Sequence, residues 1–112
     1  MYLLAGSLEP GSDAYNEVFE TAVRMYPDDM TANLNAANSA LMRGDYAGAE
    51  KYLAKAGNLP KAIYARGVLA ALRGDYATAI PLVEEAIAAG LTEAVPALEN
   101  LKESAIYGNS SN

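Results

Sequence analysis

The sequence predicts an all-α fold made of stacked antiparallel helical hairpins. Three observations lead to this prediction: a phrase that occurs twice, helix stop and start signals inside it, and small residues at helical spacing after it. Residues 43–56 and 73–86 both begin Arg-Gly-Asp-Tyr-Ala, and the second copy follows the first after 30 residues. A fixed period of that size is typical of stacked helical repeats.

Each copy of the phrase has the features of a hairpin turn. Gly44 and Gly74 can adopt the left-handed conformation that closes a helix, and the aspartate after each glycine can cap the helix that follows. In each copy the next apolar residues share one helical face. They are Ala49, Leu53 and Ala56 in the first copy, and Ala79, Val83 and Ala86 in the second.

The chain before the first hairpin predicts one more helix. Residues 1–5 resemble the last turns of a truncated helix, so we expect a fragment of a larger protein. Residues 6–12 form a loop, since they contain Pro10 and Gly11. Ser12 or Asp13 caps a helix that runs to about Met25 and is stopped by Pro27. Its apolar positions are Tyr15, Val18, Phe19, Ala22 and Tyr26.

The hairpin helices are expected at residues 30–42, 46–56, 61–72 and 76–89. Asp28 and Asp29 precede the first, Pro60 occupies a first-turn position of the third, and Gly90 closes the fourth. Pro81 should bend the fourth helix. Thr92 is expected to cap a last helix to about Ser104 with a polar outer side, as the ends of repeat stacks require.

Composition restricts the possible chemistry. The 112-residue chain is 52% apolar and 20% charged, which fits one globular domain. Its net charge of −6 disfavours a phosphate-backbone partner, so we expect no nucleic acid. The sequence has neither Cys nor His, which removes thiolate chemistry, imidazole bases and the ligands that zinc prefers. We expect no metal and no cofactor.

The remaining acidic residues favour a structural role over catalysis. They stand at helix starts, where the helix dipole favours negative charge, or on faces expected to meet water. No phosphate-binding loop or nucleophile motif occurs. The tripeptide Arg-Gly-Asp, which can mark an adhesion motif, is explained at both places by the turn. We therefore expect a protein that is not an enzyme.

The two copies together resemble the tetratricopeptide repeat, over residues 13–90. The period is 30 residues rather than about 34, and Asn33 and Ile63 stand where the family has an early aromatic residue. We expect Asn33 to loosen the packing there. The positions that carry the resemblance are Ala37, Gly44, Tyr46, Ala49, Leu53 and Ala56 in the first copy, and Gly67, Gly74, Tyr76, Ala79, Val83 and Ala86 in the second.

The resemblance implies a short right-handed α-solenoid with a C-terminal capping helix. We expect a single domain at residues 1–107, with a half repeat at 13–27, repeats at 28–58 and 59–90, the capping helix at 91–105, and a flexible tail at 108–112. It also implies a non-catalytic interaction module that binds a protein segment or a neighbouring domain on the concave face of its first helices. The expected protein-binding residues are Leu34, Asn35, Asn38, Leu41, Lys61, Tyr64 and Val68.

Alternatives stay open at this point. Asn35 and Asn38 suit hydrogen bonding to a peptide backbone, but they equally suit a solvated scaffold surface. Residues 26–45 and 63–74 also resemble the C-terminal helical region of Bacteroides-type cell-envelope proteins of OmpA-like or fimbria-related context. That resemblance implies a structural spacer or assembly scaffold in a bacterial cell envelope, without a peptide ligand. The apolar residues Tyr2, Leu3 and Leu4 suggest a homodimer through the truncated N-terminal helix.

Overall fold

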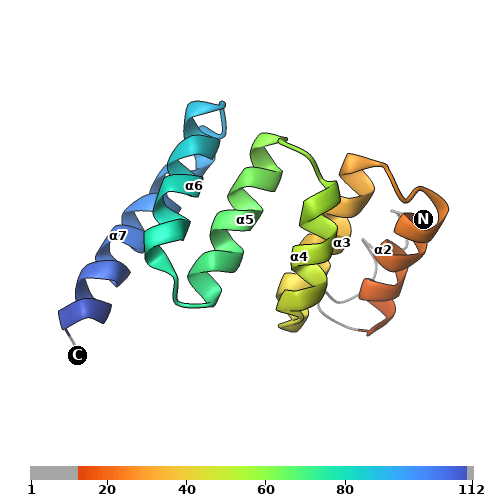
Figure 1. Cartoon of the computed structure of the whole chain (residues 1–112), viewed down its shortest axis with the longest axis horizontal. Coiled ribbons are helices and arrows are strands. Elements are labelled where there is room, and N and C mark those ends of the chain that lie inside the picture. Colours follow the sequence, from red (N-terminus) through yellow and green to blue (C-terminus); the bar gives the residue numbers. More distant parts are fainter. Residues whose placement is uncertain (1–12, 111–112) are drawn as a thin grey trace. The chain divides into compact units, whose positions relative to one another are not determined.

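The computed structural model describes residues 13–110 of the chain. Within this range it has six α-helices, one 3-10 turn and no strand (Figure 1). The predicted all-α fold class is therefore confirmed. The helix and loop expected at residues 1–12 lie outside the described residues. The elements are α2 (Asp13–Met25), α3 (Met30–Arg43), α4 (Tyr46–Lys55), α5 (Pro60–Leu72), α6 (Tyr76–Ala88), η1 (Thr92–Ala94) and α7 (Val95–Ser110).

The helices fall into two compact units. The first ends at Gly57 and the second begins at Asn58. In the first unit α3 packs against both α2 and α4, and in the second α6 packs against α5, η1 and α7. Each unit thus contains one hairpin built on the repeated phrase, together with an additional helix.

The two hairpin turns are near copies of each other. Gly44 and Gly74 have positive φ angles of 77° and 80°, which a residue with a side chain rarely adopts. Asp45 Oδ1 accepts a hydrogen bond of 3.0 Å from the backbone N–H of Gly48, and Asp75 caps α6 in the same way at 3.2 Å. The Gly-Asp sequence therefore closes one helix and starts the next, as predicted.

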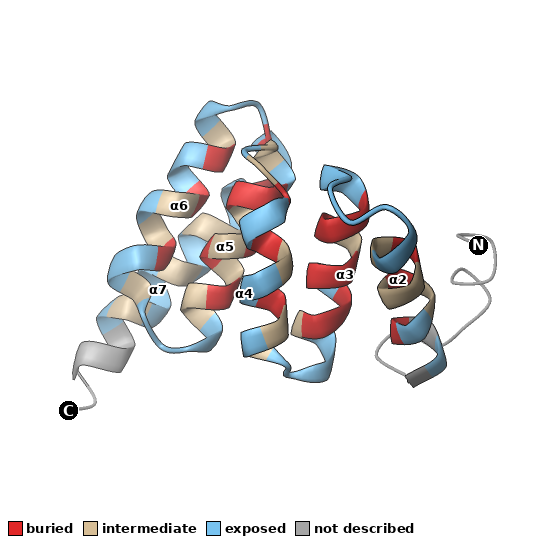
Figure 2. Cartoon of the chain, turned by 45° about the vertical axis from the view of Figure 1, so that its right-hand side comes forward, coloured by how far each residue is buried: buried red, intermediate tan, exposed pale blue. Residues whose placement is uncertain are grey.

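One buried cluster of the first unit joins two of its helices. Phe19 of α2 and Ala36 of α3 are buried together, with Val18, Val23 and Tyr52 packed against them. Figure 2 shows the buried positions of α3 as repeated bands along the helix. The first unit also buries the apolar Leu34 and Leu53 and the polar Asn33 and Ser39.

The second unit contains a buried apolar core. Ile63, Val83, Ala86, Leu91 and Ala94 are buried together, and Leu98 and Leu101 of α7 pack against them. A β-carbon added at Gly67 would lie 2.8 Å from Val83 Cγ2 and 3.3 Å from the carbonyl oxygen of Ala79. This glycine therefore lets α5 and α6 approach more closely than any side chain would allow.

Three details differ from the expectations. Tyr26 is 60% exposed and lies just beyond α2, so it does not belong to the inward face of that helix. Thr92 starts a 3-10 turn instead of capping a helix, and α7 begins at Val95. Pro96 fits the first turn of α7 because no helical partner exists there for its missing N–H. The helix then continues to Ser110, past the expected end near Ser104. Pro81 lies inside an uninterrupted α6.

Candidate functional site

The predicted binding residues on α3 do not all face the same environment. Asn38 is exposed, and Asn35 and Leu41 are half-buried. Leu34 is only 6% exposed, so its assignment to a binding surface is corrected: it serves the packing of the first unit. One stripe along α3 contains the exposed Thr31, Asn38 and Met42 and the half-buried Asn35, and we call these four residues the α3 stripe. Its spacing of four, three and four residues follows one side of a helix.

The predicted residues on α5 form the corresponding stripe of the second unit. Lys61 is exposed, and Tyr64 and Val68 are half-buried. Together with the exposed Leu72 they follow one side of the helix, and we call these four residues the α5 stripe. Tyr64 also packs against the apolar core of the second unit. Its ring therefore has a structural role in addition to any contact with a partner.

Asn33 has a different role from the other two asparagines of α3. Its side chain is fully buried, and Nδ2 donates hydrogen bonds of 2.9 Å to the carbonyl oxygens of Pro27 and Asp29. The amide thus ties the start of α3 to the preceding turn, and the expected loosening of the packing is replaced by a specific pair of bonds. Helical spacing could have separated Asn33 from Asn35, since residues two apart point to opposite sides of a helix.

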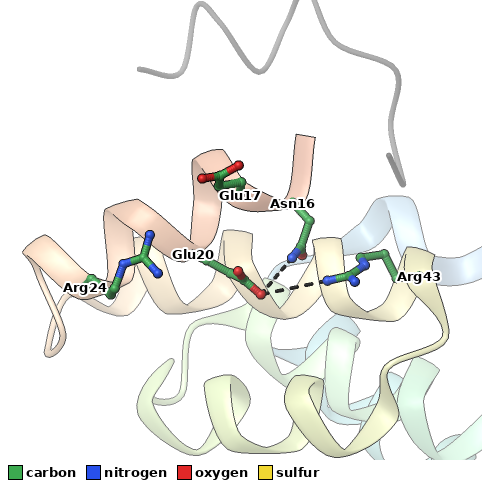
Figure 3. Close-up of a pocket in the computed structure, with 5 residues that line it drawn as sticks. All are labelled: Asn16, Glu17, Glu20, Arg24 and Arg43. Atoms are coloured by element: carbon green, nitrogen blue, oxygen red, sulfur yellow. Dashed lines mark hydrogen bonds and ion pairs between the residues drawn. The ribbon is translucent and has the colours of Figure 1, made fainter. Parts of the chain in front are cut away.

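A polar pocket between α2 and α3 was missed by the sequence reasoning. It has a volume of about 420 Å³ and is open to the surface. Figure 3 shows side chains from both helices turned toward it. Its lining residues are Asn16, Glu17, Glu20, Arg24 and Arg43.

Hydrogen bonds and an ion pair connect the two walls of this pocket. Asn16 Nδ2 donates to Glu20 Oε1 at 2.8 Å, and the buried Ser39 hydroxyl donates to Asn16 Oδ1 at 2.8 Å. Arg43 lies 3.8 Å from the same Glu20 oxygen (Figure 3). The carboxylates and guanidiniums balance one another, which suits joining α2 to α3 better than a reaction. The sequence does contain a signal for this pocket, since two polar pairs are each spaced four residues apart. They are Asn16 and Glu20 on α2, and Ser39 and Arg43 on α3.

The nearby phenol of Tyr52 titrates differently from a free tyrosine. Its pKa is raised above 10.0, first by burial and then by the negative charges of Glu20 and Asp45; Arg24 and Arg43 oppose the shift. Tyr52 packs against the buried Phe19 and Ala36. Burial and the two nearby carboxylates both favour the neutral form of its hydroxyl.

Two further properties bear on function. Within residues 13–110, no group of acidic side chains is placed to bind a metal ion. None of the helices in this range is both long and apolar enough to cross a bilayer. The Arg-Gly-Asp tripeptides lie at exposed turns, where each aspartate is used as a helix cap.

Paired helices, a repeated Gly-Asp turn and small residues at the crossing define the class of helical-hairpin repeat proteins. Within this class, residues 16–63 match the family model described as tetratricopeptide repeat. This match supports the resemblance to the tetratricopeptide repeat family over residues 16–63. Such repeats generally mediate protein–protein interaction and are generally non-catalytic. No curated protein and no solved structure matches the chain.

The matched stretch contains most of α2, all of α3 and α4, and the first turn of α5. The second hairpin lies mostly beyond it. That hairpin repeats the phrase of the first hairpin and has nearly the same turn geometry.

Proposed function

We propose that this protein binds extended segments of partner proteins, along the α3 stripe of its first unit and along the α5 stripe of its second unit. The observation that carries the proposal is the pattern of exposure on α3. Seven of its residues are buried, yet Thr31, Asn38 and Met42 stay open on one side. The match of residues 16–63 to the tetratricopeptide repeat, which generally mediates protein–protein interaction, supports the same interpretation.

The chemistry of the stripes suggests what the segment looks like. Asn35 and Asn38 offer both donors and acceptors, which match the N–H and C=O groups of an extended backbone. Lys61 offers a cation for a carboxylate, and Val68 and Leu72 offer apolar surface. The favoured ligand is therefore an extended peptide with an acidic residue near an apolar one. The single lysine of the α5 stripe makes a clamp for a C-terminal carboxylate a poor fit.

Selection from a displayed library of random peptides against the full chain tests this proposal. A selected peptide should bind the double variant Asn38→Ala with Lys61→Ala about tenfold more weakly, corresponding to ~1.4 kcal/mol. Both side chains are exposed, so the melting temperature should change little. The matched control is Lys51→Ala with Lys55→Ala on exposed positions of α4, which should bind as well as the unchanged chain. Equal affinity of the two double variants would remove the stripes from the proposal.

The second candidate function is a structural spacer or assembly scaffold of a bacterial cell-envelope protein. Its support is the half-buried state of Asn35, Leu41, Tyr64 and Val68, which leaves each of them limited surface for a ligand. Under this alternative the stripes are solvated or contact a neighbouring domain of a longer chain. Failure to select any peptide, combined with normal folding of the chain, would favour it.

A further inference from the structure

The hairpin α3–α4 is closed differently at its two ends. At one end the chain itself forms the turn at Gly44 and Asp45. At the other end Met30, the first residue of α3, meets Gly57, which follows α4 with a φ of 70°. A β-carbon added at Gly57 would collide with the Met30 sulfur and lie 3.4 Å from its Cγ. The thioether therefore lies directly on the backbone of Gly57, in space that only a glycine leaves free.

The Met30 side chain is also open to reagents in solution. It is 46% exposed, so a small oxidant can approach the side chain while it covers Gly57. The second unit has no thioether at the corresponding position, which is Pro60. There, Leu91 is buried in the apolar core and Ile87 packs against that core. Within the described residues, the contact of a methionine with a helix-closing glycine is thus particular to the first unit.

We propose that Met30 is an oxidation site whose modification opens this end of the hairpin. Hydrogen peroxide transfers one oxygen atom to Sδ: the O–O bond breaks, an S–O bond forms, and the peroxide leaves as water. The sulfur loses two electrons and the peroxide gains them. Oxidation turns an apolar thioether into a polar sulfoxide with an additional oxygen.

The sulfoxide is less suited than the thioether to this contact. The sulfur lies where an added β-carbon at Gly57 would collide with it, and a polar sulfoxide oxygen is more favourably placed in water than against the α-carbon of a glycine. The oxidised side chain therefore moves into solvent, and the contact between the start of α3 and the end of α4 is lost. Local opening should then appear at the last hydrogen bonds of α4.

Two backbone amides report this opening and its extent. The N–H of Ala56 donates to the carbonyl of Leu53 at 3.1 Å at the end of α4. The N–H of Ala89 donates to the carbonyl of Glu85 at 2.9 Å at the equivalent end of α6. Oxidation at Met30 should accelerate hydrogen exchange at Ala56 and leave exchange at Ala89 unchanged.

The experiment treats the full chain with hydrogen peroxide, locates sulfoxides by peptide mass spectrometry and follows amide exchange by NMR. Met30→Leu keeps an apolar side chain over Gly57 and removes the sulfur. The matched control is Met42→Leu, at the other end of α3, which removes a methionine that is 54% exposed. Exchange at Ala56 should rise about tenfold in the unchanged chain and in Met42→Leu, corresponding to ~1.4 kcal/mol of local stability.

In Met30→Leu the same treatment should leave exchange at Ala56 unaltered. Methionine sulfoxide reductases should reverse the effect in the unchanged chain, because they act on both sulfoxide epimers. The proposal is overturned if Met30 stays reduced while Met25 and Met42 are oxidised. It is equally overturned if Ala56 exchanges at its original rate after Met30 has been converted, or if Met30→Leu shows the same acceleration.

Discussion

The hairpins α3–α4 and α5–α6 share a turn but differ at two buried positions. Where α3 has Asn33 and Ser39, the residues thirty positions later on α5 are Ile63 and Leu69. The two polar side chains are fully buried and hydrogen-bonded. Ile63 and Leu69 are buried as well, and Ile63 packs with other apolar groups. A common backbone phrase therefore fixes the hairpin, while each unit satisfies its interior separately.

The difference implies unequal tolerance to substitution at equivalent positions. A hydrogen-bonded interior fails when a donor is lost, because the acceptor stays buried. An apolar interior is destabilised when a polar group is placed in it, because no hydrogen-bonding partner is available there. Exchanging the residues of one unit for those of the other is thus the strongest way to test the comparison.

The largest effect is expected for Ile63→Asn. This change removes an apolar side chain that is 7% exposed and buries an amide among Val83, Ala86 and Leu91. Loss of apolar burial costs about 1.5–3 kcal/mol, and the unsatisfied amide costs a further ~1–3 kcal/mol. Urea unfolding measures the sum. The control is Lys61→Asn on the same helix, which is exposed and should change stability by no more than about 0.5 kcal/mol.

The reciprocal change, Asn33→Ile, should cost less than Ile63→Asn. It removes the two bonds from Nδ2 to Pro27 and Asp29 and leaves their carbonyl oxygens without that donor, at about 1–3 kcal/mol. Part of this cost is offset because Asn33 Oδ1, which is buried without a hydrogen-bond partner, disappears as well. A stabilised Asn33→Ile chain would show that the two interiors are interchangeable and that the comparison fails.

The two hairpins also differ at the point where their helices cross, and we expect a substitution there to have an effect of intermediate size on stability. Position 37 in α3 is a fully buried alanine, whereas position 67 in α5 is a glycine that has Val83 Cγ2 in the way of a β-carbon. Gly67→Ala gains helix propensity of up to about 1 kcal/mol, but the forced shift of Val83 costs ~1–3 kcal/mol. We expect a net loss of roughly 1 kcal/mol, measured by thermal and urea unfolding.

The double variant Gly67→Ala with Val83→Ala separates these two contributions. Removing the methyl groups of Val83 removes the collision, so Gly67→Ala should no longer destabilise the chain in that background. If Gly67→Ala lowers the stability of the chain equally with Ala and with Val at position 83, the close approach of α5 and α6 is not the reason for the glycine at position 67.

The sequence predicted most of the fold because its signals were local. Gly44, Asp45 and their repeats gave the turns, and Pro60 and Gly90 gave helix boundaries that depend only on nearby backbone. The start of α7 was wrong by a few residues, because Thr92 offers a side-chain cap in sequence but starts a 3-10 turn in the structure.

The candidate site could be predicted less well because it depends on burial. Leu34 and Asn33 sit in a helix with many small residues, and only the packing of α2 and α4 decides which side stays open. The polar pocket needs Asn16 and Ser39, which are 23 residues apart in sequence, to meet at 2.8 Å. Pairing of this kind is set by tertiary contact, which no local pattern reports.

The smallest expected effect concerns Tyr52, whose counterpart in the second unit is Leu82. Because burial and nearby carboxylates raise its pKa above 10.0, the folded chain holds the phenol proton more tightly than the unfolded chain. The resulting stability is fully present below pH 10 and is lost as the pH rises through the higher folded value. NMR of the Tyr52 ring measures the titration. Glu20→Gln should shift the titration to lower pH, because one of the negative charges that raise the pKa of Tyr52 is then gone. Glu17→Gln should leave the titration in place. Equal shifts in the two variants would mean that Glu20 does not act on Tyr52 through its charge.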